Sequence, residues 1–384
     1  MTDAAGPAPV AGPLAVGATL TVTAVVRERR SDGIAVLDCR GVDQTGQIVL
    51  TAIVDLRAPA VAVPPPALAP NRINEHLRHR QLVQRFAGQK PVRIAVVHPC
   101  DGCSVAGAAE AAAAGLIEPV LVGPEAKIRA AAKDAGIDIS RFRLVATPHS
   151  HAAAAAAVAM ARNGEVEALM KGSLHTDELM HEVVDPATGL CTGRRVSHVY
   201  LFDVPAYSRP LLITDAAINI QPTLEDKRDI CQNAIDLART IGIATPKVAI
   251  LAAVETVSAR MPSTIDAAAL CKMADRGQIT GGRLDGPLAF DNAISAEAAR
   301  TKGIVSAVAG EADILLVPDL EVGNMLAKQL TFLAGADAAG IVVGARLPIV
   351  LTSRADSIST RVASCAIAAL MVAARRAAVP AVPV

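Results

Sequence analysis

Near the start of the chain, apolar residues alternate with polar ones in three runs. The runs cover residues 20–26, 34–37 and 48–54, and turn sequences containing Asp and Gly separate them at residues 31–33 and 43–46. Alternation with a period of two is typical of antiparallel strands with one covered face. The segment therefore predicts a three-stranded meander.

A proline-dense stretch between residues 57 and 70 follows the third run. Proline lacks a backbone N–H and cannot continue a sheet, so this stretch favours an extended spacer. We place the domain boundary here. The prediction is a β segment over residues 1–58, a linker over residues 59–71 and a main domain over residues 72–384.

Beyond the linker, short apolar strands alternate with alanine-rich helices. A strand over residues 92–97 and a helix over residues 105–114 begin this series, which is typical of βαβ units around a largely parallel sheet. Residues 196–202 and 211–214 are two strands with no helix between them, so a local antiparallel segment is expected there. The other predicted elements are strands at 119–122, 166–170, 247–253, 313–317, 339–343 and 348–351, and helices at 126–135, 149–163, 262–275 and 319–334, from Thr223 and from Asp356.

The pattern as a whole predicts an α/β protein. About 310 residues of continuous α/β sequence indicate two lobes, whose ligands bind beyond the carboxyl ends of the strands. The short antiparallel β segment precedes them.

Composition and charge narrow the classes of protein. Hydrophobic residues make up 52% of the chain and aromatic residues only 2%, so alanine and aliphatic side chains must fill the core. The 37 basic and 37 acidic residues balance, which argues against a nucleic-acid partner. The most apolar segment, residues 362–374, is shorter than the ~18–20 residues of a spanning helix, so we expect a buried terminal helix and no membrane association. The N-terminus shows no signal-peptide pattern, and the seven cysteines favour reduced thiols in the cytoplasm.

Two patterns raise the question of a metal site. Cys100-x-x-Cys103 has no second such pair to complete four zinc ligands, and we interpret it as a turn in which Asp101 or Ser104 caps the following helix. No metal site is predicted, and the absence of G-x-G-x-x-G and G-x-x-x-x-G-K-[ST] argues against common nucleotide-binding motifs. Solvated or capping histidines are expected at the pairs His149 with His151 and His175 with His181.

Polar loops follow five of the predicted strands. They bring cations at Lys171, Lys328 and Arg354, together with hydroxyl, amide and helix N-terminal donors, which suits an anionic ligand. We expect all five loops at one edge of the sheet, where they would line a cleft. The loops cover residues 171–173, 214–219, 285–291, 318–328 and 351–357.

Four ordered motifs in these loops resemble the phosphate acetyltransferase and phosphate butyryltransferase family. The similarity extends from about residue 71 to residue 374 and implies a two-lobed, three-layer α/β/α fold of the isocitrate dehydrogenase-like type. The TDAAINI and SRADS forms are more similar to the butyryl-type branch than to the acetyl-type branch. The motifs are TDAAINI-x-P at residues 214–222, DGPLA-x-D-x-A at 285–293, PDL-x-x-GN-x-x-x-K at 318–328 and SRADS at 353–357.

The N-terminal β segment resembles the second half of a MaoC-like hotdog domain. The first half of such a domain would supply the central helix and the Asp and His dyad that the family uses for hydration. We expect this chain to lack that half, so the segment is a partial hotdog and no hydratase activity is expected.

The family resemblance implies transfer of a short acyl group, acetyl or butyryl, between coenzyme A and inorganic phosphate to give acyl phosphate. Direct transfer in a ternary complex requires no protein nucleophile. No cofactor is expected, because the coenzyme A thioester is itself the substrate. The expected partners are acyl-CoA, phosphate and a second copy of the chain in a homodimer or higher oligomer.

The resemblance also implies roles for individual residues. Ser353 corresponds to the serine that stabilises the transition state, and Arg354 to the arginine that holds phosphate or the acyl group. The family's proposed thiol base lies seven positions after that serine, where this chain has Thr360, so Asp356 or Asp215 is considered instead. Substrate-binding residues are expected at Lys171, Asn219, Gly286, Asp291, Gly323, Asn324 and Lys328.

Three questions stay open at this point. A chain without the family's base and with a partial hotdog segment could be a non-catalytic acyl-CoA sensor or assembly module. A dehydrogenase is a weaker alternative, because the family shares its fold with isocitrate dehydrogenase-like enzymes. A first-lobe arginine of the acetyl-type enzymes has no matching motif here, and either Arg194 or Arg195 could take its place.

Overall fold

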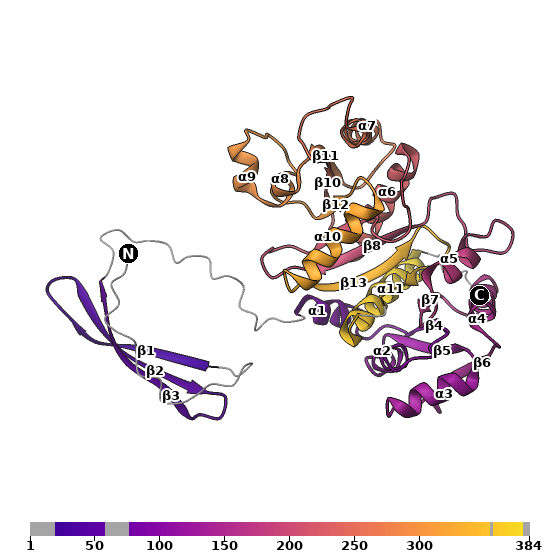
Figure 1. Ribbon diagram of the computed structural model, residues 1–384, viewed down its shortest axis with the longest axis horizontal. Helices are drawn as coiled ribbons and strands as arrows, with labels where there is room; N and C mark the ends of the chain where they lie inside the picture. Colours follow the sequence, from indigo (N-terminus) through magenta and orange to yellow (C-terminus); the bar gives the residue numbers. More distant parts are fainter. Residues whose placement is uncertain (1–19, 58–76, 354–355, 379–384) are drawn as a thin grey trace. The chain divides into compact units, whose positions relative to one another are not determined.

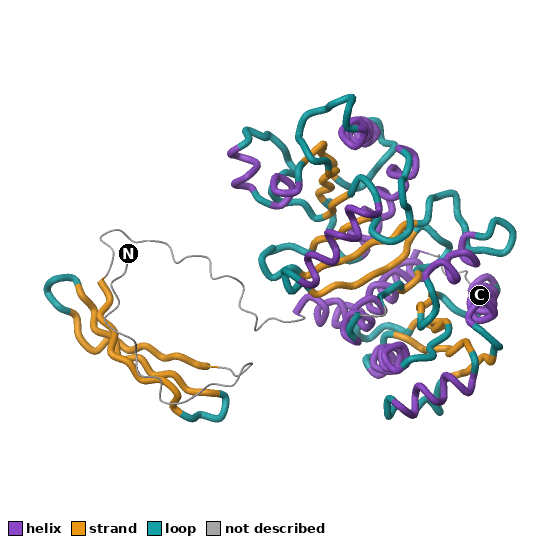
Figure 2. The backbone as a smooth tube through the Cα atoms, in the orientation of Figure 1, coloured by secondary structure: helices purple, strands orange, loops and turns teal. Residues whose placement is uncertain are grey.

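The computed structural model describes residues 20–57, 77–353 and 356–378. The chain divides into two compact units, Met1–Leu68 and Ala69–Val384 (Figure 1). In its described part the first unit contains strands only, whereas the second contains both helices and strands (Figure 2).

Three antiparallel strands make up the described part of the first unit, in the order β1-β2-β3. The predicted meander is confirmed, and Gly33 and Gly46, with φ values of 82° and 86°, close its two turns. Val22 and Val25 point to opposite faces of the sheet and are 52% and 59% exposed, so both faces carry exposed apolar side chains. The strands are β1 (Leu20–Arg29), β2 (Ile34–Asp43) and β3 (Ile48–Arg57).

An eleven-stranded mixed sheet runs through the second unit in the order β11-β10-β12-β9-β8-β13-β14-β7-β4-β5-β6. The predicted α/β class is confirmed. The strands are β4 (Val92–Val97), β5 (Ile117–Gly123), β6 (Arg143–Ala146), β7 (Ala168–Lys171), β8 (Ser197–Asp203), β9 (Leu211–Thr214), β10 (Lys247–Leu251), β11 (Arg283–Leu288), β12 (Ile314–Leu316), β13 (Asp337–Val343) and β14 (Ile349–Val350). The helices are α1 (Leu77–Phe86), α2 (Gly102–Ala113), α3 (Glu125–Asp134), α4 (Ser150–Arg162), α5 (Thr176–Val184), α6 (Leu224–Thr240), α7 (Pro262–Asp275), α8 (Phe290–Ile294), α9 (Ala296–Thr301), α10 (Leu320–Phe332) and α11 (Ile358–Ala378).

Strand direction reverses across the centre of this sheet. Strands β4 to β7 with β14 form a parallel first half, and β9 to β12 form a parallel second half. The two central strands, β8 and β13, pair antiparallel with each other, β8 with β9 and β13 with β14, which confirms the predicted antiparallel segment. The two halves therefore run in opposite directions. The expectation that all five polar loops share one edge is wrong, because the carboxyl ends of the two halves face opposite edges.

One predicted loop is a strand. Residues 285–291 lie in β11 and α8 instead of an open loop, and β11 pairs only with β10, so it is an edge strand. Pro287 is compatible with an edge strand because its missing N–H is not needed for a ladder there. The Gly-Pro pair that indicated a loop therefore marks the sheet edge. The pattern also missed α1, β6, α5 and α9.

The cores on the two faces of the sheet differ. A shared core lies on one face and extends under both halves, with Val96 of β4 and Leu212 of β9 among its members. The opposite face carries two separate cores, one for each half. Along β13, Ala338 belongs to the second half's core and Val342 to the first half's core, and both lie on this face because side chains alternate. Gly340 lies between them, so the separate cores stop at the centre of the sheet.

Helix α11 packs into the shared core. Of the described helices, only α11 is long and apolar enough to meet the length and composition of a membrane span, and 61% of its most apolar window is buried within the fold. Its buried face includes Ala363, Cys365 and Ile367. The predicted buried terminal helix is confirmed.

Candidate active site

Two ring side chains and a glycine lie at the centre of the sheet between the two separate cores. They are His198 and Tyr200 of β8 and Gly340 of β13. The rings of His198 and Tyr200 are in edge-to-face contact, with centroids 4.4 Å apart. A Cβ atom at Gly340 would lie 2.4 Å from the carbonyl oxygen of Leu351, so a side chain there would displace the chain that leaves β14. This carbonyl also lies 3.5 Å from His198 Nε2.

The segment after β14 carries three of the predicted catalytic residues, of which Ser353 and Asp356 are described. The Ser353 N–H donates to Asp356 Oδ2 (2.6 Å), and the Asp356 N–H donates to the Ser353 carbonyl oxygen (3.2 Å). These two bonds hold Ser353 and Asp356 against each other. Ser353 is exposed and Asp356 is half-buried. Arg354 lies outside the described residues.

Burial and charge act in opposite directions on Asp356. Burial raises the pKa of this carboxyl group above its usual range, while the Ser353 N–H and the charges of Arg361 and Lys171 oppose the rise. Burial, with a contribution from the Asp356 charge, raises the pKa of Tyr200 to about 12. A carboxyl group with a raised pKa is well suited to exchange a proton with a substrate.

Lys171 ends β7, the strand next to β14. It is 4% exposed, and its Nζ donates to the Gly172 carbonyl oxygen (3.2 Å). Ser173 fixes the rest of this loop to the turn after β4: its Oγ donates to the His98 carbonyl oxygen (2.9 Å) and accepts from the Cys100 N–H (3.1 Å). The first half therefore brings Lys171 and the loop after β14 to one edge of the sheet.

The Cys-x-x-Cys segment is the predicted turn at the start of α2. Asp101 caps the helix by accepting from the Ser104 N–H (2.9 Å), as expected. His149 is also a capping residue, because its Nδ1 accepts from the Ala152 N–H at the start of α4 (3.2 Å). No group of three His, Cys, Asp or Glu side chains in the described ranges is arranged to hold a metal ion.

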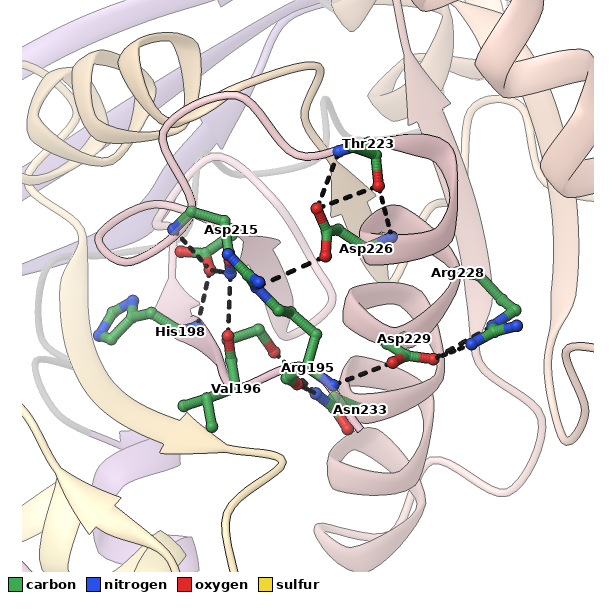
Figure 3. Close-up of polar contacts among 11 residues, drawn as sticks. Arg195, Val196, His198, Asp215, Thr223, Asp226, Arg228, Asp229 and Asn233 are labelled. Carbon is green, nitrogen blue, oxygen red and sulfur yellow. Dashed lines mark hydrogen bonds and ion pairs between the residues drawn. The ribbon is translucent and has the colours of Figure 1, made fainter. Parts of the chain in front are cut away.

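Asp215 organises the loop that follows β9. Its Oδ1 accepts the N–H groups of Ala217 and Ile218 (2.9 and 3.0 Å). Its Oδ2 accepts the His198 N–H (3.2 Å) (Figure 3) and also accepts from Asn219 Nδ2 (2.6 Å). The carboxylate is 2% exposed and already accepts several hydrogen bonds. Of the two candidate bases, it is therefore less suited to take a proton from a thiol.

Asn219 connects this loop to α6 through Arg195. Its Oδ1 accepts from Arg195 Nε (2.7 Å). Arg195 also forms an ion pair with Asp226 in the first turn of α6 (3.5 Å) (Figure 3). Arg194 instead pairs with Asp236 further along α6. Of the two arginines left open by the sequence, Arg195 is the one that contacts a predicted site residue.

Helix α10 packs against the same loop. A Cβ atom at Gly323 would lie 2.5 Å from the Asp215 carbonyl oxygen, so the helix approaches this closely only with glycine at that position. Asn324 Nδ2 donates to the Ala216 carbonyl oxygen (3.1 Å). Lys328 lies one turn further along α10 and is exposed. The second half thus brings Asp215, Gly323 and Asn324 together in a second group.

Two predicted binding residues lie apart from both groups. Gly286 is in the edge strand β11, where a Cβ atom would lie 2.8 Å from the Ile250 Cβ, so its position reflects close packing on β10. Asp291 is on α8 and pairs with Lys302 (3.3 Å). The strand order separates β11 from the central strands by β10, β12 and β9.

The sequence interpretation missed Arg361, the residue after Thr360. Arg361 is 2% exposed, and it donates to Thr352 Oγ1 (2.9 Å) and to the Ser353 carbonyl oxygen (3.1 Å). Thr360 itself bonds Ser357 Oγ (3.0 Å) in the first turn of α11. The signal in the sequence was a single arginine that interrupts the apolar pattern of the last helix.

A groove of about 1090 Å³ lies at the carboxyl ends of the second-half strands. Apolar side chains, among them Met261, Phe290 and Leu326, line much of it. Its polar lining includes Asp319 of the PDL motif and the buried Lys227, which pairs with Asp266 (2.7 Å). An apolar groove with a few fixed polar groups is typical of a small-molecule site.

Comparison with known proteins identifies relatives over most of the second unit. Residues 149–369 match the family described as "Phosphate acetyl/butaryl transferase". A phosphate acetyltransferase of Rhizobium meliloti is 65% identical over 301 residues, which cover 78% of this chain and 95% of that protein. A phosphate butyryltransferase of Clostridium acetobutylicum is 40% identical over 291 residues, which cover 76% and 97%. The expected closer similarity to the butyryl-type branch is not reflected in these two identities.

Solved structures agree with this match. A branched-chain phosphotransacylase from Enterococcus faecalis V583 has a TM-score of 0.64 at 29% identity, covering 73% of this chain and 99% of that one. A phosphotransacetylase from Streptococcus pyogenes shares the fold, with a TM-score of 0.67 at 22% identity over 78% of this chain and 99% of that one. The chain therefore belongs to the phosphate acetyl/butyryl transferase family.

Proposed function

We propose that this protein is an acyltransferase that moves a short acyl group between coenzyme A and inorganic phosphate. The observation that carries the proposal is the contact between Ser353 and Asp356, which follows the strand β14 beside buried Lys171, in a family whose relatives are named for this reaction. Acyl phosphate and free coenzyme A form in one direction, and acyl-CoA and phosphate form in the other.

The chemistry of each step suits these side chains. A phosphate oxygen attacks the thioester carbonyl carbon, the carbon–sulfur bond breaks, and the coenzyme A thiolate leaves. Ser353 would donate to the carbonyl oxygen as it gains charge, while Lys171 and Arg354 would supply positive charge for phosphate. Protonated Asp356 would give its proton to the thiolate, and in reverse its carboxylate would take the proton from the thiol.

Coenzyme A is a substrate in this scheme, and we propose no further cofactor. The seven cysteines are free thiols, and we propose the cytoplasm as the location. We propose no hydratase activity for the N-terminal β segment.

The test is phosphate-dependent release of coenzyme A. Purified full-length protein is incubated with acetyl-, propionyl- and butyryl-CoA, each with and without phosphate, and thiol release is followed. Phosphate-stimulated release with at least one thioester is expected, and the ranking of the three reports the acyl preference. No stimulation with any of them, together with tight acyl-CoA binding by calorimetry, would instead favour the sensor function that the threonine at position 360 leaves open.

We further propose that the protein forms a homodimer through helix α10, which belongs to the second half of the second unit. Large apolar side chains are exposed along one face of α10, including Met325 (61%), Phe332 (75%) and, just beyond the helix, Leu333 (84%). Apolar side chains gathered on one exposed surface are typical of protein–protein contacts.

The variant Phe332→Glu is therefore expected to convert the dimer to a monomer, because a charge would have to be buried in the contact. Light scattering coupled to size exclusion measures the mass. Val305→Glu is the matched control, since Val305 is fully exposed on a loop and its substitution should leave the mass unchanged. A monomeric wild type, or a Phe332→Glu variant with unchanged mass, would contradict this surface.

A further inference from the structure

Arg361 has an environment that is unusual for an arginine. It is 2% exposed and is the largest fully buried side chain in the described part of the chain. Its two terminal nitrogens donate to Thr352 Oγ1 and to the Ser353 carbonyl oxygen, and its Nε is buried without a hydrogen-bond partner in that part. The guanidinium therefore binds the Thr352 side chain and the Ser353 backbone, and it donates to no carboxylate among the described residues.

The stem of Arg361 is fixed by α2. A Cβ atom at Gly107 would lie 2.8 Å from Arg361 Cδ and 3.0 Å from its Cβ. The aliphatic part of the Arg361 side chain therefore packs directly on Gly107, where a methyl group would collide with it. Because packed interiors resist small shifts, the guanidinium has little freedom to leave Thr352 and Ser353.

A buried charge without a paired carboxylate costs free energy, and such departures from the rules of folding are expected mainly at functional sites. The charged groups near Asp356 indicate which function could offset the free-energy cost of burying Arg361. The positive charges of Arg361 on α11 and Lys171 on β7 act to lower the pKa of Asp356. The charge of Asp356 contributes to the raised pKa of Tyr200 on β8. Arg361 is the cation that α11 brings to these residues.

We propose that Arg361 is a positioning residue for acyl transfer. Its two hydrogen bonds position the Thr352 side chain and the Ser353 backbone, and its charge favours the ionised form of Asp356. This inference rests on the proposed function, in which Asp356 in its ionised form accepts the thiol proton. Arg361 acts only through these residues and touches no reacting atom.

Two substitutions of Arg361 separate its charge from its hydrogen bonds. Arg361→Met keeps the volume but removes both, so kcat for acyl-CoA formation is expected to fall by up to about 10²-fold. The acidic limb of the kcat/KM profile should move to higher pH, because Asp356 loses a nearby positive charge. Arg361→Lys keeps the charge, so it should lose part of kcat and leave the limb in place.

A second variant tests the same idea from another helix. Gly107→Ala should push the Arg361 stem away and reproduce both effects of Arg361→Met in weaker form. Gly102→Ala adds the same methyl group to the same helix, but there the nearest atom would be 3.4 Å away, an ordinary contact. This control should match the wild type in kcat and in the position of the limb. It also keeps the test valid if Arg361→Met fails to fold.

The proposal is overturned if Arg361→Met keeps the wild-type limb, or if Arg361→Lys is as impaired as Arg361→Met, because the loss would then be structural. An activity-independent measurement distinguishes this from failure of the proposed function. In protein labelled with ¹³C at aspartate carboxyl groups, the Asp356 signal, assigned with Asp356→Asn, should titrate at higher pH in Arg361→Met than in the wild type. An unchanged titration contradicts the role of Arg361 even if no turnover is found.

Discussion

Replacing Ser353 by alanine is expected to lower kcat by roughly 10² to 10³-fold, because the substitution removes one donor to the carbonyl oxygen in the transition state. Ser353 is exposed, and its contact with Asp356 uses the backbone N–H, which alanine retains. The bond from the residue 353 N–H to Asp356 is therefore available in the variant as well. Steady-state rates of acyl-CoA formation from acyl phosphate and coenzyme A measure the effect.

The control for this variant is Ser359→Ala, which removes a hydroxyl from the first turn of α11, where Ser359 bonds Ser357. It should keep nearly the full rate. KM for both substrates should change little in Ser353→Ala if the hydroxyl acts mainly in the transition state. Equal rates in Ser353→Ala and the wild type would remove Ser353 from the mechanism.

The second large effect is expected for Asp356→Asn. A general base contributes about 10² to 10⁴-fold, so the rate of acyl-CoA formation should fall within this range. In the wild type, kcat/KM should decrease as the pH falls through the pKa of Asp356, because the carboxylate must be ionised to accept the thiol proton. Since burial raises this pKa, the limb should lie above the usual range of an aspartate, which is near 3.9.

Asp356→Asn should abolish that limb as well as lower the rate, and the pH profile is the decisive measurement. Asp215→Asn provides the comparison, since it would disturb the hydrogen bonds that hold its own loop. It should lower thermal stability and activity together while the acidic limb stays in place. A limb that survives in Asp356→Asn and disappears in Asp215→Asn would reverse the assignment of the base.

Local features of the fold were predictable because they depend on nearby residues. The period of two in the first unit, the capping of α2 by Asp101 and the antiparallel pair β8 and β9 all follow from short segments. The reversal of strand direction across the whole sheet was not predictable in this way. It depends on how β13 and β14 return to the centre, and no local pattern encodes that path.

The candidate site was predictable in part for the same reason. The motifs identified Ser353 and Asp356, and the polar loop at residues 171–173 identified Lys171. These three residues lie at the same edge of the first half. The choice between the two aspartates required their hydrogen-bond partners, which are set by contacts between distant segments. Arg361 was missed because a buried arginine and an exposed one look alike in a sequence.

The shared core beneath both halves of the second unit bears on how this protein could be divided or recombined. Each half completes one face of its sheet with the same apolar layer, which includes residues of β4 and β9 and the buried apolar residues of α11. Neither half could be excised as an independent module without leaving that layer open to water. Insertions and exchanges between family members are therefore best tolerated in the loops over the opposite face, where the two cores are already separate.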